Sequence, residues 1–173
     1  EESQQLHLNP KSGRWLPDNS RIQRHVNIAV AYNVWQYYAA TGDAAFLAAH
    51  GAEMLLEIAR FLASLASFDE ALGRYRVLGV MGPDEYHDAY PGSERPGVDD
   101  NAYTNVMTVW VLARALQVLE RLPATRRDEL VDELCLEAEE RRLWQDIMRR
   151  MYVPFLDGGI VSQFEGFGDL EEF

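Results

Sequence analysis

The chain of 173 residues has little cysteine, little lysine and no long hydrophobic run. Cys135 is its single cysteine, which excludes an internal disulfide. We expect this residue to pack as a small apolar side chain in a reducing compartment, and the protein to be cytoplasmic. Even the apolar stretch at residues 106–113 falls far short of the roughly 20 residues that span a bilayer. The sequence therefore predicts a soluble protein that makes no use of a membrane.

Positive charge is also scarce. The chain has 16 Lys and Arg against 28 Asp and Glu, which gives a net charge of −12, and Lys11 is the only lysine. Nucleic acids and anionic membrane surfaces are bound by basic residues that neutralise phosphate, so this balance disfavours both as partners. With 47% hydrophobic residues the chain is long enough to bury one core, and we expect it to form part of one domain.

The first residues contain no initiator Met, basic region or apolar signal core, and the last residues end equally abruptly. We therefore interpret residues 1–173 as a piece of a longer protein. A closed barrel positions groups from several loops, and only one set of loops is present, so we expect the piece to be inactive alone. Helices taken out of a larger fold would expose apolar faces, so we also expect it to be able to self-associate as a homo-oligomer.

The apolar residues follow a helical spacing along most of the chain. Gly42 permits a reversal between two helices, Asp43 is placed to cap the second, and Pro123 ends a later one. The predicted helices are residues 23–40, 44–66 and 103–122, a helix that begins at residue 125, and residues 139–151. Short strands are expected at residues 75–80 and 159–163. These patterns predict an all-α fold of helical hairpins with long loops and minor short strands.

Two polar segments between the helices carry the chemistry. The first is Gly82-Pro83-Asp84-Glu85-Tyr86-His87, and the second is Asp99-Asp100-Asn101-Ala102-Tyr103-Thr104-Asn105. Gly82 and Pro83 break any regular element, so Glu85 is predicted to lie on an irregular rim where its carboxyl group reaches a ligand. Asp99 or Asp100 is expected to cap the helix that follows.

Sugar sites combine flat apolar rings with hydrogen-bonding groups, and side chains of both kinds occur in or near these segments. Trp35 is predicted either in the core or at a cavity wall, since an aromatic residue at helical spacing is usually core. Asn101 and Asn105 are able to bind hydroxyl groups, although an Asn at a helix start is more often a cap. The candidate substrate-binding residues are Trp35, Tyr86, His87, Asn101, Tyr103 and Asn105.

The two segments together resemble the catalytic part of glycoside hydrolase family 65, which includes maltose, trehalose and kojibiose phosphorylases and some hydrolases. Further resemblance lies in residues 31–37, 41–43, 56–61 and 163–166, in the order and approximate spacing of that family. The family often has two Asn where this chain has Asp100 and Asn101. The resemblance implies that the chain is a central part of an (α/α)6 barrel and belongs to a single catalytic domain.

By the same resemblance, Glu85 matches the catalytic general acid, which donates a proton to the glycosidic oxygen as the C–O bond breaks. The implied reaction is inverting phosphorolysis of an α-linked glucose disaccharide to β-glucose 1-phosphate. Inorganic phosphate is the co-substrate in place of a second carboxylate, and neither a further cofactor nor a metal is expected.

Three alternatives stay open at the level of the sequence. An inverting α-glucoside hydrolase of the same family would need a second carboxyl group as a base. A non-catalytic carbohydrate-binding helical domain would bind sugar without chemistry. A metal site is the third, because oxygen and imidazole ligands cluster in Asp84, Glu85, His87, Asp88, Asp99 and Asp100, although their spacing matches no familiar ligand motif.

Overall fold

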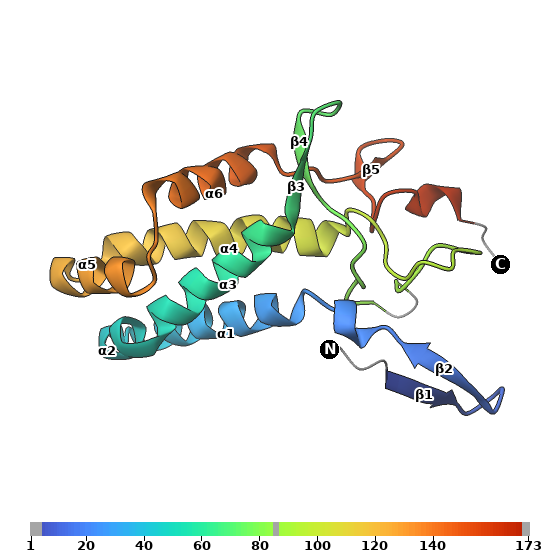
Figure 1. Ribbon diagram of the computed structural model, residues 1–173, viewed down its shortest axis with the longest axis horizontal. Helices are drawn as coiled ribbons and strands as arrows, with labels where there is room; N and C mark the ends of the chain where they lie inside the picture. Colours follow the sequence, from blue (N-terminus) through green and yellow to red (C-terminus); the bar gives the residue numbers. More distant parts are fainter. Residues whose placement is uncertain (1–4, 85–86, 171–173) are drawn as a thin grey trace.

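The computed structural model describes residues 5–84 and 87–170 of the chain, and most of them are helical (Figure 1). Two of the longer helices, α1 and α3, are separated by a short α2 and a π-helical turn at Leu47–Gly51. The helices are α1 (Val26–Thr41), α2 (Ala44–Phe46), α3 (Ala52–Leu65), α4 (Ala102–Arg121), α5 (Ala124–Glu133) and α6 (Ala138–Arg150), with 3-10 turns at Ser20–Ile22 and Phe167–Asp169.

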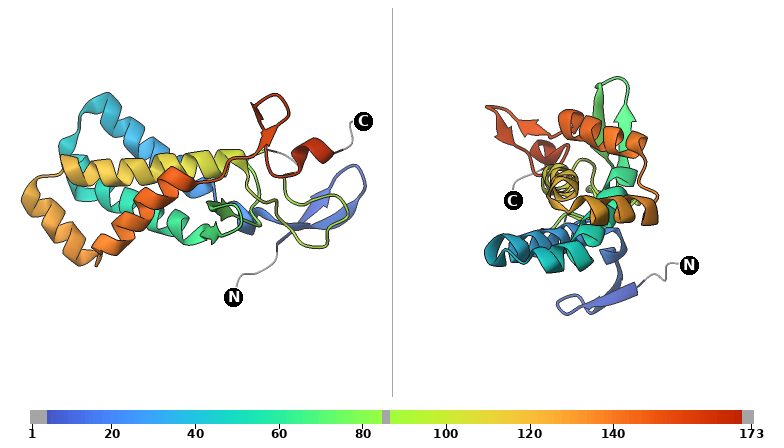
Figure 2. Two further views of the ribbon diagram at one scale, coloured as in Figure 1. Left: turned by 90° about the horizontal axis from the view of Figure 1, so that it is seen from above. Right: turned by 90° about the vertical axis from the view of Figure 1, so that its left-hand side faces the viewer.

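The 20-residue helix α4 is the centre of the packing, because it contacts α1, α3 and α6. The views in Figures 1 and 2 show α1 and α3 along one side of α4 and α6 along another. Aliphatic side chains from these helices meet with Trp144 of α6 in one core; fully buried members are Ile28, Leu55, Leu62, Leu112 and Ile147.

Three two-stranded antiparallel hairpins complete the fold. They pair β1 (Gln5–Asn9) with β2 (Arg14–Asp18), β3 (Ala66–Asp69) with β4 (Arg74–Val77), and β5 (Phe155–Leu156) with β6 (Ile160–Val161). The long loop between β4 and α4 and the β5–β6 hairpin lie at the end of the bundle where α4 begins, whereas α5 lies at the opposite end (Figure 1). The loops therefore gather at one end of the helices.

The predicted helices are confirmed within a few residues, and so are two of their ends. Gly42 ends α1 in the left-handed conformation, and the Asp43 side chain accepts a hydrogen bond from the Phe46 N–H at 2.8 Å. An ion pair joins two residues three apart on α3, with 2.6 Å between Arg60 Nη1 and Glu57 Oε1. Arg60 Nε in addition contacts Glu140 Oε1 at 2.7 Å, which joins α3 to α6.

The strands were predicted less well. The helix expected to reach residue 66 ends at Leu65, because the following residues pair as β3 with β4 instead. The Asp69 side chain accepts hydrogen bonds from the Ala71 and Leu72 N–H groups, a local turn that closes this hairpin. The strand expected at 75–80 is shorter, with one further bridge from Val80 to Val98. The β1–β2 hairpin was not predicted.

The expectation that Cys135 packs as a small apolar residue is wrong. It is exposed, and it has a positive φ of 48° in the connection between α5 and α6, beside Leu136, which enters the core instead. Within the described part of the chain, no helix combines the length and the apolar character that a membrane span requires.

Candidate active site

A pocket of about 260 Å³ opens where α4 begins, and both polar segments of the sequence contribute to it. Pro83, Asp84 and His87 come from the loop before α4, and Asn101 and Tyr103 come from its first turn. The remaining wall is formed by Ala102 and by the segment Val161, Ser162 and Gln163, which includes the end of β6. We call this cavity the loop-end pocket.

Gly82 allows the two segments to approach closely. Its N–H donates to the His87 carbonyl oxygen at 2.9 Å, which closes the turn that carries Asp84. A Cβ atom at this position would lie 2.7 Å from Asn101 Nδ2 and 2.8 Å from His87 Cβ, closer than real Cβ atoms come to heavy atoms. Only glycine fits here without movement of two pocket residues.

His87 is 9% exposed and presents an unused ring nitrogen. Its ring packs edge-on against Phe164, with 5.0 Å between ring centroids, and lies 6.3 Å from Phe167. Nδ1 is buried and has no hydrogen-bond partner among the described residues. Buried polar atoms normally have a partner, so this nitrogen is a hydrogen-bonding group that the described residues leave unsatisfied.

Asn101 caps α4, which corrects the expectation that Asp99 or Asp100 does so. Its Oδ1 accepts from the Thr104 N–H at 3.0 Å, and its Nδ2 donates to the Gln163 carbonyl oxygen at 3.3 Å. The two aspartates are engaged elsewhere, because Asp99 Oδ1 accepts from the Gly79 N–H at 2.9 Å and Asp100 is turned into the protein. Asn101 therefore fixes the helix start and ties it to the segment after β6.

Asp100 is fully buried and holds the turn before α4. Its φ of 51° lies in the left-handed region, which Asp tolerates better than most residues. Arg76 of β4 contacts Asp100 Oδ2 through Nε at 2.6 Å and Nη2 at 2.5 Å. The Val77 N–H and Asn105 Nδ2 each donate a hydrogen bond to Asp100 Oδ1 at 3.2 Å. Burial raises the pKa of Asp100, and the hydrogen bonds from Arg76 and Asn105 oppose that rise.

The other candidate residues have different environments. Tyr103 is 42% exposed and lines the loop-end pocket, with its ring edge-on to His25. Asn105 is fully buried. Its Nδ2 donates to Asp100 Oδ1 and, at 2.8 Å, to the Tyr152 carbonyl oxygen, so it stabilises the turn at Asp100 from inside the protein. Trp35 lies in the core and does not line the pocket, because α1 directs its ring toward α4, where Arg114 lies 5.0 Å from the ring centroid.

Glu85 and Tyr86 lie outside the described residues, while the residues on either side of them, Asp84 and His87, both line the loop-end pocket.

A hydrogen-bonded group formed by Tyr90, Asp99, Tyr152 and Glu165 was not identified from the sequence as a unit. Tyr90 Oη donates to the Glu165 carbonyl oxygen at 2.8 Å and accepts from the Asp99 N–H at 3.0 Å, and Tyr152 Oη donates to Glu165 Oε2 at 2.9 Å. Burial and the hydrogen bond to Glu165 raise the pKa of Tyr152. Arg76 and Ser162 gave no signal in the sequence, because nothing local distinguishes them from ordinary surface residues.

The metal alternative gains no support from the geometry. Across residues 5–84 and 87–170, no three His, Cys, Asp or Glu side chains are grouped in a way that could hold a metal ion.

The chain matches a family model over its whole length. Residues 1–173 match the model described as the glycosyl hydrolase family 65 central catalytic domain. The chain therefore belongs to glycosyl hydrolase family 65, as its two polar segments indicate.

Two similar proteins align with nearly the whole of this chain. It is 56% identical over 172 residues to an uncharacterized glycosyl hydrolase of Mycobacterium tuberculosis, covering 99% of this chain and 13% of that protein. It is 38% identical over 172 residues to a trehalose 6-phosphate phosphorylase of Lactococcus lactis, covering 99% of this chain and 21% of the relative. The chain thus spans about a fifth or less of the length of these relatives.

A solved structure shares the fold. It is a human-microbiome protein assigned as a kojibiose phosphorylase, which superposes with a TM-score of 0.71 at 26% identity and covers 83% of this chain and 19% of that structure. The helical arrangement is thus that of a segment of a family 65 enzyme.

Proposed function

We propose that the loop-end pocket forms part of the active site of an inverting glycoside phosphorylase whose substrate is an α-linked glucose disaccharide. One observation carries this proposal: two segments separated by a long loop, residues 82–87 and 99–105, meet at a single pocket. Asp84 and His87, the residues on either side of the Glu85–Tyr86 pair, line it together with Tyr103, whose side chain is half-exposed, and His87 Nδ1 is a buried polar atom without a partner among the described residues. This is the combination of an acid, an aromatic face and polar groups that sugar chemistry requires.

In the proposed reaction, the Glu85 carboxylic acid donates its proton to the glycosidic oxygen while the bond from that oxygen to C1 breaks. A phosphate oxygen attacks C1 from the opposite face and forms the new C1–O bond. The α configuration is thereby inverted, which yields β-glucose 1-phosphate and a free hydroxyl group on the released sugar. No carboxylate base is needed, because phosphate is already an anionic nucleophile.

We assign the pocket residues around Glu85 to substrate binding. His87 and Asn101 would contact sugar hydroxyl groups through His87 Nδ1 and Asn101 Nδ2, and Tyr103 and Tyr86 would provide ring faces. Asn105 acts indirectly, because it holds Asp100 and hence the turn that carries Asn101. Trp35 has no place in this part of the site.

The proposal places the chain in a larger (α/α)6 barrel, of which these helices would form an arc. Exposed apolar side chains on the sides of α1 and α4 support this, since Val26, Val30, Tyr32 and Val106 are each at least 38% exposed. The remaining helices of the barrel would cover them and would complete the phosphate site.

Hydrolysis is the competing reaction, because a relative that is 56% identical, from Mycobacterium tuberculosis, is named as an uncharacterized glycosyl hydrolase. Water would then be the nucleophile, and a second carboxyl group would have to lie about 6.5–9.5 Å from the first.

The deciding experiment incubates the intact protein that carries this chain with maltose, trehalose, kojibiose and trehalose 6-phosphate, with and without inorganic phosphate. Phosphate-dependent release of β-glucose 1-phosphate is expected for one of them. Release of free glucose at the same rate without phosphate would instead identify a hydrolase.

A further inference from the structure

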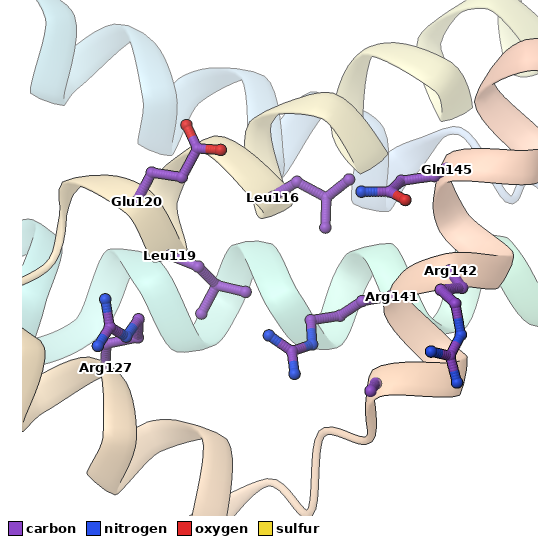
Figure 3. A pocket seen from close by; sticks show the side chains of 8 residues that line it. Leu116, Leu119, Glu120, Arg127, Arg141, Arg142 and Gln145 are labelled. Atoms are coloured by element: carbon purple, nitrogen blue, oxygen red, sulfur yellow. The ribbon is translucent and has the colours of Figure 1, made fainter.

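A second cavity of about 470 Å³ lies near the other end of the bundle, between α4, α5 and α6 (Figure 3). Leu116 and Leu119 of α4 form its apolar side, and Arg127 of α5 and Arg141 and Arg142 of α6 provide its charge. Leu116 follows Tyr103 by 13 residues on α4, which is about 20 Å along the helix axis. This cavity, the arginine pocket, is therefore separate from the loop-end pocket.

The charge of the arginine pocket is opposite to that of the chain. Three guanidinium groups and one carboxylate, that of Glu120, line it, in a chain whose net charge is −12. In Figure 3 the Glu120 carboxylate points away from the three guanidinium groups. Arg127 and Arg142 each also contact a carboxylate outside the lining, so Arg141 is the one of the three without such a partner among the described residues, and its positive charge favours an anionic ligand.

Arg141 lacks the acceptor that such a group normally has. Its Nε is buried and has no hydrogen-bond partner among the described residues, and no ion pair forms to its guanidinium group in that part of the chain. Arg60, which packs nearby against α6, shows the usual arrangement, because Glu140 accepts from both its Nε and Nη2. A buried donor left unpaired is costly, so the geometry around Arg141 indicates an acceptor from a ligand.

The other two arginines are held only loosely. Arg127 pairs with Asp128 and Arg142 with Glu139, and these carboxylate side chains are 70% and 72% exposed. Exposed ion pairs contribute little to stability, so both guanidinium groups are free to turn to an anion at small cost.

We propose that the arginine pocket binds the phosphate group of a small phosphorylated molecule. Guanidinium groups match phosphate oxygens with paired N–H donors. With Arg127 and Arg142 turned from their exposed carboxylates to the ligand, three positive charges would face it, which suits a dianion better than a single carboxylate. Ala138, the first residue of α6, also lines the cavity, so the positive end of that helix dipole adds to the attraction. The volume exceeds that of phosphate alone and lies in the range of small-molecule sites, which leaves space for a sugar ring against Leu116 and Leu119.

This site does not depend on the proposed function, and the test must separate it from any phosphate bound at the active site. Arginine side chains of the intact protein are modified with phenylglyoxal, and the modified positions are mapped by mass spectrometry. Inorganic phosphate and glucose 6-phosphate are the two probes, glucose is the uncharged control, and Arg149 is the internal reference because it lies on α6 outside the pocket with a side chain 69% exposed.

We expect phosphate and glucose 6-phosphate, but not glucose, to protect Arg127 and Arg141 while Arg149 reacts unchanged. If the sugar ring contributes, glucose 6-phosphate will protect at lower concentration than phosphate. Arg141→Gln should weaken protection of Arg127 by about tenfold to a hundredfold, the effect of losing a charge-assisted hydrogen bond, whereas Arg149→Gln should not.

Equal modification of Arg141 with and without both phosphate probes would overturn the proposal. So would an Arg141 that is unreactive in the absence of any anion, because another segment of the protein would then occupy the pocket. If Arg141→Gln fails to fold, Arg127→Gln with protection of Arg141 as the readout makes the same test.

Discussion

The first two turns of α4 bury polar side chains, whereas its remaining turns bury aliphatic ones. Near the loop-end pocket the buried residues include Thr104, Asn105 and Thr108, and beyond them they are Val111, Leu112, Ala115, Val118 and Leu119. One helix thus passes from a hydrogen-bonded region to a conventional hydrophobic core.

The two regions stabilise the fold by different means. Burial of aliphatic surface is favourable but not directional, so the core end sets how stable the helices are. Hydrogen bonds around Asp100 and Asn101 contribute less net free energy but fix positions, because each buried group must meet its partner. Substitutions at the core end should therefore reduce stability first, and substitutions at the loop end should reduce activity first.

The largest change in stability is expected at the core end. Leu112 is fully buried, so Leu112→Ala should lower the free energy of unfolding by about 2–5 kcal/mol through lost burial and the cavity left behind. Turnover per folded molecule of the intact enzyme should change little. Urea unfolding measures the stability, and kinetics normalised to active sites measure the turnover. A large loss of turnover with unchanged stability would contradict the assignment of stability to the core end and activity to the loop end.

A comparable loss, about 3 kcal/mol, is expected for Asp100→Ala, because Arg76 would be left without its buried partner. Asp100→Asn is the matched control, since Asn has the same shape, accepts from the Val77 N–H and tolerates the left-handed backbone. It should cost clearly less. Equal losses in urea unfolding would show that the charge pair contributes nothing beyond shape.

Gly82→Ala tests how closely the two polar segments must approach. The added methyl group would push apart Asn101 and His87. We expect the free energy of unfolding to fall by about 1–3 kcal/mol and the KM for the disaccharide to rise markedly. Gly92→Ala is the control, because Gly92 has a positive φ of 73° but open space around its Cβ position. It should lose some stability without a change in KM, and similar kinetics in both variants would refute the steric argument.

The smallest effect on stability is expected at the cap of α4. Asn101→Ala should cost about 1 kcal/mol, and Asn101→Ser should recover most of it, because the Ser hydroxyl also accepts from the first-turn N–H groups. If Asn101 in addition binds sugar through Nδ2, Asn101→Ser will keep a raised KM despite restored stability. A fully restored KM would show that Asn101 caps α4 but does not bind the sugar.

The contrast between the aliphatic core end and the hydrogen-bonded loop end also explains which features the sequence predicted. The core end was predictable, because aliphatic spacing, Gly42, Asp43 and Pro123 determine the helices locally. Of the residues predicted to bind substrate, His87, Asn101 and Tyr103 line one pocket, since polar residue types on a loop indicate a site, and their role in binding stays a prediction. The role of Asp100 was not predicted, because it depends on Arg76 in a distant strand, and β1–β2 was missed because its pairing is set between segments and not within them.

The central claim is that the loop-end pocket presents Glu85 as the acid of a phosphorolysis. It is tested most directly by turnover of the disaccharide substrate by the intact protein with Glu85→Gln, beside a folding control by circular dichroism. The account predicts an unchanged fold and a fall in kcat of about 10²–10⁴-fold, since Gln has no proton to donate. An unchanged kcat with a disaccharide whose leaving group needs protonation would contradict it.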